Sequence, residues 1–255
     1  MSQSELFIIV GSASFAALVA VGVTVAIEKW GGVIGGLLGT LPTTIVPASI
    51  GFTQQAADQQ ALVDALCATP PGMLLNVGFL WLWRVLPRRI AIRATFPRVT
   101  LLLTLTLSAW GGFATVFVLG MDRLNSVGIS TPILGGAAAL LMLVAGILAC
   151  SRRPPAPSAK RAVRGAVLVT RGLLAGAAIG VAVWMVNVAG PIAAGVASVF
   201  PAIFLTTMVS LSLAHGDRVQ VGAVGPMMLG SSSVSAYALL AAWLIPTIGL
   251  TTGAV

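Results

Sequence analysis

Long apolar segments, separated by short polar or basic stretches, make up almost the whole chain. Eight of them are long enough to cross a bilayer as helices, because about 20 apolar residues span the hydrocarbon core. They cover residues 5–28, 31–52, 66–86 (with a lead-in from about 59), 98–120, 131–150, 163–187, 190–214 and 219–250. The apolar runs are continuous rather than alternating, which favours helices over a transmembrane β-barrel. The pattern therefore predicts an all-α integral membrane protein with about eight transmembrane helices.

Composition agrees with this interpretation. Hydrophobic residues make up 58% of the chain and charged residues only 8%, whereas soluble domains carry roughly 25% charged residues. So few charges cannot cover a surface that faces water. The N-terminus lacks a basic region before its long apolar run, so we expect a retained first helix rather than a cleaved signal peptide. We expect the protein in a bacterial inner membrane.

Basic residues are concentrated in two short segments beside apolar runs, 87–98 and 151–164. Together these segments carry Arg88, Arg89, Arg93, Arg98, Arg152, Arg153, Lys160, Arg161 and Arg164. Such clusters are typical of cytoplasmic loops near anionic lipid, so the net charge of +8 does not indicate a nucleic-acid partner. The segment 53–65 has no Lys or Arg and should lie outside. With eight spans, both termini then lie outside.

Two of the apolar segments, 31–52 and 190–211, share a pattern of Gly and Pro. When Pro42 is placed on Pro201, at an offset of 159 residues, further matches follow without a gap. These pairs are Gly31 with Gly190, Gly36 with Gly195, Asp58 with Asp217, and Pro87 with Pro246. Gly and Pro mark backbone constraints, so their recurrence in register indicates an internal repeat, although coincidence between two Gly-rich helices is the alternative.

The repeat divides one membrane domain into three parts. Residues 1–96 form a first three-helix repeat, 97–159 hold two intervening helices and a basic linker, and 160–255 form the second repeat. Because five spans separate the starts of the two repeats, they are inverted relative to each other. Inverted repeats are common in secondary transporters.

This 3+2+3 arrangement, with both termini outside and a basic loop after the third helix, resembles the ZIP family of divalent-metal transporters. In that family the fourth and fifth helices carry metal ligands. Here 98–120 and 131–150 contain neither His nor a carboxylate, so metal transport by that mechanism is not expected. The motif AGVASVFPAIFL (194–205) gives a further, weaker resemblance to the GlpM-like small bacterial inner-membrane proteins.

The second and seventh helices combine Pro with hydroxyl side chains. A Pro within a helix leaves a carbonyl without its partner, and in lipid that carbonyl needs a hydroxyl or a bound solute. The third and eighth helices also look interrupted, at 69–73 and 225–233. The substrate-binding residues that we expect are Thr40, Pro42, Thr43, Thr44, Asn76, Asn187, Ser198, Pro201, Thr206, Thr207, Ser231 and Ser232. The alternative is a set of kinked helices that pack through small residues.

Ionisable residues are few within the predicted spans. Glu28 is the deepest carboxylate, and Asn187 takes the equivalent place in the second repeat. The candidates for proton or ion coupling are Glu28, Arg171, Asp58, Asp217 and His215. Membrane carboxylates tend to be functional, although Glu28 could instead pair with Lys29 as an interfacial cap.

We therefore expect a secondary transporter of a small solute or ion, with its site between the second and seventh helices. A passive channel and a lipid-handling or structural membrane protein are the alternatives. No pairing of nucleophile and base or phosphate loop is present, so no enzyme activity, cofactor or resident metal is expected. The expected partners are the solute, membrane lipids and, through the small residues of 131–150, a second copy in a homodimer.

Overall fold

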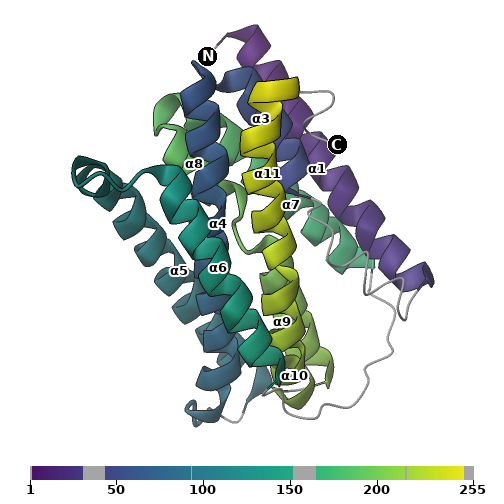
Figure 1. Ribbon diagram of the computed structural model, residues 1–255. Helices are drawn as coiled ribbons and strands as arrows, with labels where there is room; N and C mark the ends of the chain where they lie inside the picture. The colour runs from purple at the N-terminus through teal and green to yellow at the C-terminus, as the bar shows by residue number, and fades with distance from the viewer. Residues whose placement is uncertain (1, 31–43, 93, 152–164, 216, 250–255) are drawn as a thin grey trace.

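The computed structural model describes residues 2–30, 44–92, 94–151, 165–215 and 217–249. Throughout these ranges the chain forms helices and short connections, without a strand (Figure 1). The helices are α1 (Gln3–Trp30), α3 (Ile45–Gln55), α4 (Gln59–Val85), the short 3-10 helix η1 (Leu86–Arg88), α5 (Thr95–Ser126), α6 (Thr131–Ser151), α7 (Gly165–Val188), α8 (Pro191–Ser198), α9 (Ala202–His215), α10 (Asp217–Gly230) and α11 (Ser232–Ile248).

Seven helical segments among the described residues are long and apolar enough to cross a membrane. They cover 3–22, 59–88, 95–126, 131–151, 165–188, 191–213 and 220–248. The prediction of an all-α chain of membrane-length helices is thereby confirmed for seven of the eight spans. Much of the other expected span, 31–52, lies outside the described residues, and its second half forms α3.

The outer faces of the bundle are apolar. On α5, the side chains of Phe113, Val116 and Leu119 are 65%, 69% and 75% exposed. On α6, Leu140 and Leu141 are similarly exposed. Apolar surface on this scale is rare on soluble monomers and fits contact with lipid.

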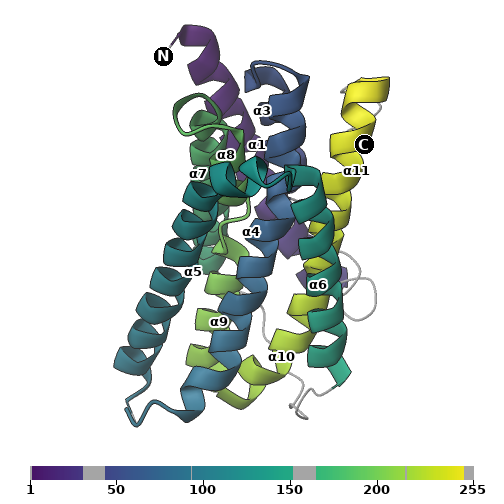
Figure 2. The same cartoon turned by 60° about the vertical axis from the view of Figure 1, so that its left-hand side comes forward.

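Helix α4 runs along the middle of the bundle and contacts α5, α6, α8, α10 and α11 (Figure 2). Its side chains supply several of the largest buried groups, including Leu66, Phe79, Leu80 and Trp83. Trp83 donates its indole N–H to the hydroxyl of Thr106 on α5, at 3.1 Å. Helix α4 is therefore the element around which the other helices are placed.

Helix α4 continues without interruption through Pro70 and Pro71. The expected break at 69–73 is therefore wrong. Each proline leaves one carbonyl of the preceding turn without its helical partner. For Pro71 this is the carbonyl of Cys67, against which Gly135 of α6 packs so closely that an added Cβ would lie 2.6 Å from its oxygen. Helix α6 therefore packs directly against this carbonyl.

Two other spans are interrupted. The span that starts at Pro191 breaks at 199–201 into α8 and α9, and the last span turns at Ser231 between α10 and α11. Pro201 lacks an N–H, and a proline disfavours helical backbone at the residue before it, here Phe200. In Figures 1 and 2, α8 lies in the upper part of the bundle and α9 in the lower part.

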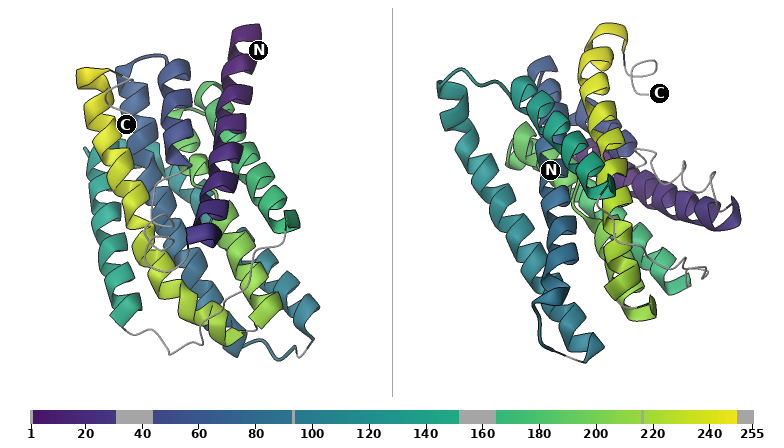
Figure 3. Two further views of the ribbon diagram at one scale, coloured as in Figure 1. Left: turned by 90° about the vertical axis from the view of Figure 1, so that its right-hand side faces the viewer. Right: turned by 60° about the horizontal axis from the view of Figure 1, so that its bottom comes forward.

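Helices α1 and α7 pack antiparallel through small residues. An added Cβ at Gly172 would meet Val21, one at Gly176 would meet Ala13, and one at Gly180 would meet Ala13 and Ile9. The two helices therefore run in opposite directions along this contact. The start of α1 and the end of α11 lie at the same end of the bundle (Figure 3).

Candidate functional site

The interruption between α8 and α9 lies within the protein rather than at its surface. Val199, Pro201 and Ala202 are buried, and Phe200 is half-buried. The amide of Phe200 donates to the carbonyl of Ala197, and that of Leu205 donates to the carbonyl of Pro201. These bonds close the two helix ends separately, so the chain between them is not part of either helix.

Asn76 of α4 borders this interruption. Its Nδ2 donates to the carbonyl of Val199 at 2.7 Å and lies 3.4 Å from the sulfur of Met73. The side chain is 1% exposed, and within the described part of the chain its Oδ1 has no hydrogen-bond partner. Buried amide oxygens are normally paired. Asn76 therefore presents an open hydrogen-bond acceptor beside the break.

Trp110 of α5 borders the same interruption from another direction. Its ring meets that of Phe200 edge to face, with 5.5 Å between centroids and 87° between planes. The indole nitrogen is buried and, among the described residues, has no acceptor for its N–H. Trp110 therefore presents an open hydrogen-bond donor.

Two glycines allow α8 to approach α4 closely. An added Cβ at Gly195 would collide with the carbonyl oxygen of Ala65 and lie 2.8 Å from the Cβ of Ala68. An added Cβ at Gly72 would lie 2.6 Å from Val199 and 3.1 Å from the Cα of Val196. This contact holds Val199 within reach of the Asn76 side chain.

Arg171 of α7 lies about one turn beyond the break. Its Nε donates to the hydroxyl of Thr206 at 3.1 Å, and its Nη2 donates to that of Thr207 at 2.7 Å. Both hydroxyls belong to α9, so the half-buried guanidinium joins α7 to α9. Thr206 is itself buried and also donates to the carbonyl of Ala202, at the start of α9.

Part of the predicted site is thus assembled in one place. Asn76 and Pro201 border the interruption, Ser198 ends α8, and Thr206 and Thr207 follow on α9. The Ser198 hydroxyl donates to the carbonyl of Gly195 at 2.7 Å.

Other predicted residues lie elsewhere. Asn187, at the end of α7, donates to Oε1 of Gln55 at 2.7 Å. Ser231 and Ser232, at the turn between α10 and α11, donate to carbonyls of α10. Asp58 is exposed and caps α4 by accepting from the amide of Ala61 at 2.8 Å.

Some predicted residues cannot be placed in this way. Thr44 stands directly before α3, without a side-chain capping bond. Thr40, Pro42 and Thr43 lie outside the described residues, as do the side chains of Glu28, His215 and Asp217.

Sequence reasoning missed Trp110, and it also left aside the buried hydroxyl of Ser235. Trp110 lies inside an apolar span with no polar neighbour to draw attention to it. Tryptophans are commoner at membrane interfaces, so its place in the span was the available signal. Ser235 is fully buried, with its hydroxyl 3.9 Å from the sulfur of Met142.

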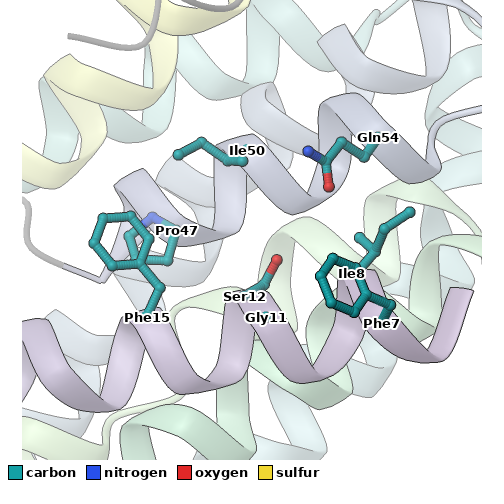
Figure 4. A pocket seen from close by; sticks show the side chains of 8 residues that line it. All are labelled: Phe7, Ile8, Gly11, Ser12, Phe15, Pro47, Ile50 and Gln54. Carbon is teal, nitrogen blue, oxygen red and sulfur yellow. The ribbon is translucent and has the colours of Figure 1, made fainter. Parts of the chain in front are cut away.

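A separate pocket of about 220 Å³ lies between α1 and α3 (Figure 4). Its lining is mostly aromatic or aliphatic, with two polar side chains among them. The lining residues are Phe7, Ile8, Gly11, Ser12, Phe15, Pro47, Ile50 and Gln54. In Figure 4 the Ser12 hydroxyl points from α1 toward α3.

Comparison of the chain with family models, with curated proteins and with solved structures found no match. Within the described ranges, no three His, Cys, Asp or Glu residues gather closely enough to hold a metal ion. The geometry at the α8–α9 interruption is therefore the main guide to function.

Proposed function

We propose that the protein is a secondary transporter that moves a small solute by alternating access, through a site at the α8–α9 interruption. The observation that carries this proposal is the open acceptor of buried Asn76 beside a broken membrane-length helix. Interrupted helices supply free backbone groups at solute sites in many transporters. In lipid an irregular backbone is tolerated where it is enclosed by protein or lines a cavity.

The packing of α1 on α7 supports an inverted repeat. Under the offset of 159 residues, Ala13 corresponds to Gly172 and Ala17 to Gly176. Exchanging each residue for its equivalent turns the contact between Ala13 and Gly176 into the contact between Gly172 and Ala17, which is also present. The same exchange turns the contact between Ala17 and Gly176 into itself. An antiparallel pair with exchangeable contacts is what a two-fold axis in the membrane plane would produce. The offset came from Pro42 and Pro201, which are not part of this contact.

The helix boundaries support the same repeat. Helix α4 begins at Gln59, one residue after Asp58, and α10 begins at the equivalent Asp217. Helix α3 ends at Gln55, and α9 ends within one residue of the equivalent position. The ZIP-like 3+2+3 order, with both termini outside, is part of our proposal, as are the bacterial inner membrane and a homodimer through α6.

In this proposal each half contributes to one central site. Asn76 of α4 and its equivalent Ser235 of α11 are both buried, and α4 contacts α11. Two inverted halves can exchange conformations, so that inward-open and outward-open states have similar energies. The interruption at 199–201 would then be exposed to one side of the membrane at a time.

The pocket between α1 and α3 favours a second candidate, lipid handling. Under the same offset Ser12 corresponds to Arg171, whose side chain bridges α7 and α9. The first half has no long side chain at that position, and its pocket is lined mainly by apolar groups. An acyl chain would fit there better than a solute.

Cysteine accessibility at Ser198 distinguishes these functions. Ser198 is 2% exposed, so Ser198→Cys, in a background without Cys67 and Cys150, should react only if the protein opens. A transporter predicts slow reaction with impermeant thiol reagents from both sides of reconstituted vesicles. Ser212→Cys, equally buried but away from the break, should stay unreactive.

Two results would contradict the transporter. Complete protection of Ser198→Cys from both sides would exclude an aqueous path through the break. Protection from aqueous reagents, together with quenching of a label on α1 or α3 by brominated lipid, would favour lipid handling instead.

A further inference from the structure

We propose that the solute is small and uncharged, and that it carries both a hydrogen-bond donor and an acceptor, as a primary amide, a urea or a polyol does. This inference rests on the proposed transport function and specifies its substrate class. It follows from two buried polar atoms and from the kinds of side chain that surround them.

The two side chains that carry these atoms contact consecutive residues of the interruption. Asn76 donates to the carbonyl of Val199, and the ring of Trp110 meets that of Phe200 edge to face. The Oδ1 of Asn76 needs a donor and the Nε1 of Trp110 needs an acceptor, and neither has one among the described residues. A buried polar group without a partner is unfavourable, so a solute that pairs with both would be bound there in preference to an apolar one.

The orientation of the Asn76 amide is fixed by its neighbour. Its donor end lies 2.7 Å from the carbonyl of Val199, which can only accept. The oxygen end must therefore be the open one, and it selects an N–H or O–H group of the solute. The indole of Trp110 can only donate, so it selects a carbonyl or hydroxyl oxygen.

The surrounding side chains disfavour an ion. Every buried polar residue in the described part of the chain is uncharged. On α9, Thr206 and Thr207 accept from two guanidinium nitrogens of Arg171. Moving an ion from water into a buried site without a counter-charge is costly. A neutral solute needs only the two hydrogen bonds that the break offers.

Osmotic swelling of reconstituted vesicles tests this inference. The probes are urea, acetamide and erythritol as uncharged solutes, lactate and phosphate as anions, and methylammonium as a cation. Light scattering after rapid mixing gives each entry rate, and vesicles without protein give the background. We expect protein-dependent entry for at least one uncharged probe and for none of the ions.

Trp110→Phe tests the site itself. The substitution keeps a ring against Phe200 but removes the N–H, so the fold should survive. One net hydrogen bond corresponds to about a three- to ten-fold change, and we expect entry of the uncharged probe at low concentration to slow by that factor. The matched control is Trp243→Phe on α11, whose side chain is 67% exposed. It should leave the rate unchanged.

The outcomes separate this inference from the transport proposal. Protein-dependent entry of an anion or cation, without entry of uncharged probes, would overturn the substrate class and leave the transporter intact. Entry of an uncharged probe at the same rate in Trp110→Phe and wild type would overturn the assignment of the site. Entry of no probe, together with an unreactive Ser198→Cys, would overturn both.

Discussion

Replacement of Gly195 by alanine should disturb the contact that holds α8 against α4. The new Cβ would collide with the carbonyl oxygen of Ala65 and lie 2.8 Å from the Cβ of Ala68. Both neighbours belong to the backbone or to its first side-chain atom, so neither can move aside by a change of rotamer. Relief therefore requires α8 to move away from α4, which would lengthen the 2.7 Å bond between Asn76 and Val199.

The magnitude follows from two opposing effects. Overpacking a well-packed contact costs about 1–3 kcal/mol, and alanine in a helix is favoured over glycine by about 0.5–1 kcal/mol. The net loss is therefore at most about 2.5 kcal/mol, which for a chain of this size lowers the apparent Tm by up to roughly 10 °C. Cys67, 3% exposed on α4, provides the assay, since a thiol-reactive dye reports its exposure on heating in a Cys150→Ser background.

Gly136→Ala is the matched control. Gly136 lies on α6, and an added Cβ there has no neighbouring atom within 4 Å. Only the helix preference acts at this position, so the apparent Tm should rise by up to about 4 °C. If Gly195→Ala were as stable as Gly136→Ala, the close packing of α8 on α4 would be refuted.

Three further predictions concern other parts of the bundle. Arg171→Met removes two bonds between α7 and α9 and should lower the apparent Tm by several degrees, whereas Arg123→Met, at an exposed position, should leave it unchanged. Gln220→Leu leaves the carbonyl of Trp83 and the hydroxyl of Ser212 without their partner, which should lower the free energy of unfolding in SDS by about 1–3 kcal/mol. An unchanged free energy of unfolding would refute these two hydrogen bonds. Ser2→Cys and Arg88→Cys should be labelled from opposite faces of the membrane, and labelling from one face would contradict the predicted orientation.

Most of the fold follows from the sequence because lipid imposes a strong constraint. Backbone groups must be paired within each span, so a long apolar segment becomes a helix almost regardless of its neighbours. For this reason the spans at 98–120, 131–150 and 163–187 agree with α5, α6 and α7 to within a few residues at most ends. The segment from Gln59, expected only as a lead-in, is part of α4, because Asp58 caps the longer helix.

The site could be predicted only in part, because it depends on contacts between spans. Pro201 and Thr206 were found from their own helix, where Pro and hydroxyl residues occur together. Trp110 was missed because it is placed at the interruption by its contact with Phe200, which is distant in sequence and adjacent in space. Asn187 was assigned to the site by position alone, but its amide is bonded to Gln55 at the end of α7.

Proline by itself does not decide where a membrane helix breaks. Pro70 and Pro71 leave α4 continuous, whereas Pro201 separates α8 from α9. In α4 the carbonyl of Cys67 lies against Gly135 of α6, and the helix continues past it. At the interruption between α8 and α9, the carbonyl of Val199 accepts a hydrogen bond from the Asn76 side chain. This bond replaces the backbone hydrogen bond that the carbonyl would accept in a continuous helix.

This difference links the fold to the proposed transport. Once Nδ2 of Asn76 is committed to Val199, its Oδ1 is left open in the protein interior. A solute that donates to that oxygen satisfies it without disturbing the bond that stabilises the break. The same side chain would then hold the interrupted helix and bind the solute, so movement of α8 relative to α4 would change both together. Uncoupling them, as Gly195→Ala is expected to do, should therefore weaken solute binding as well as stability.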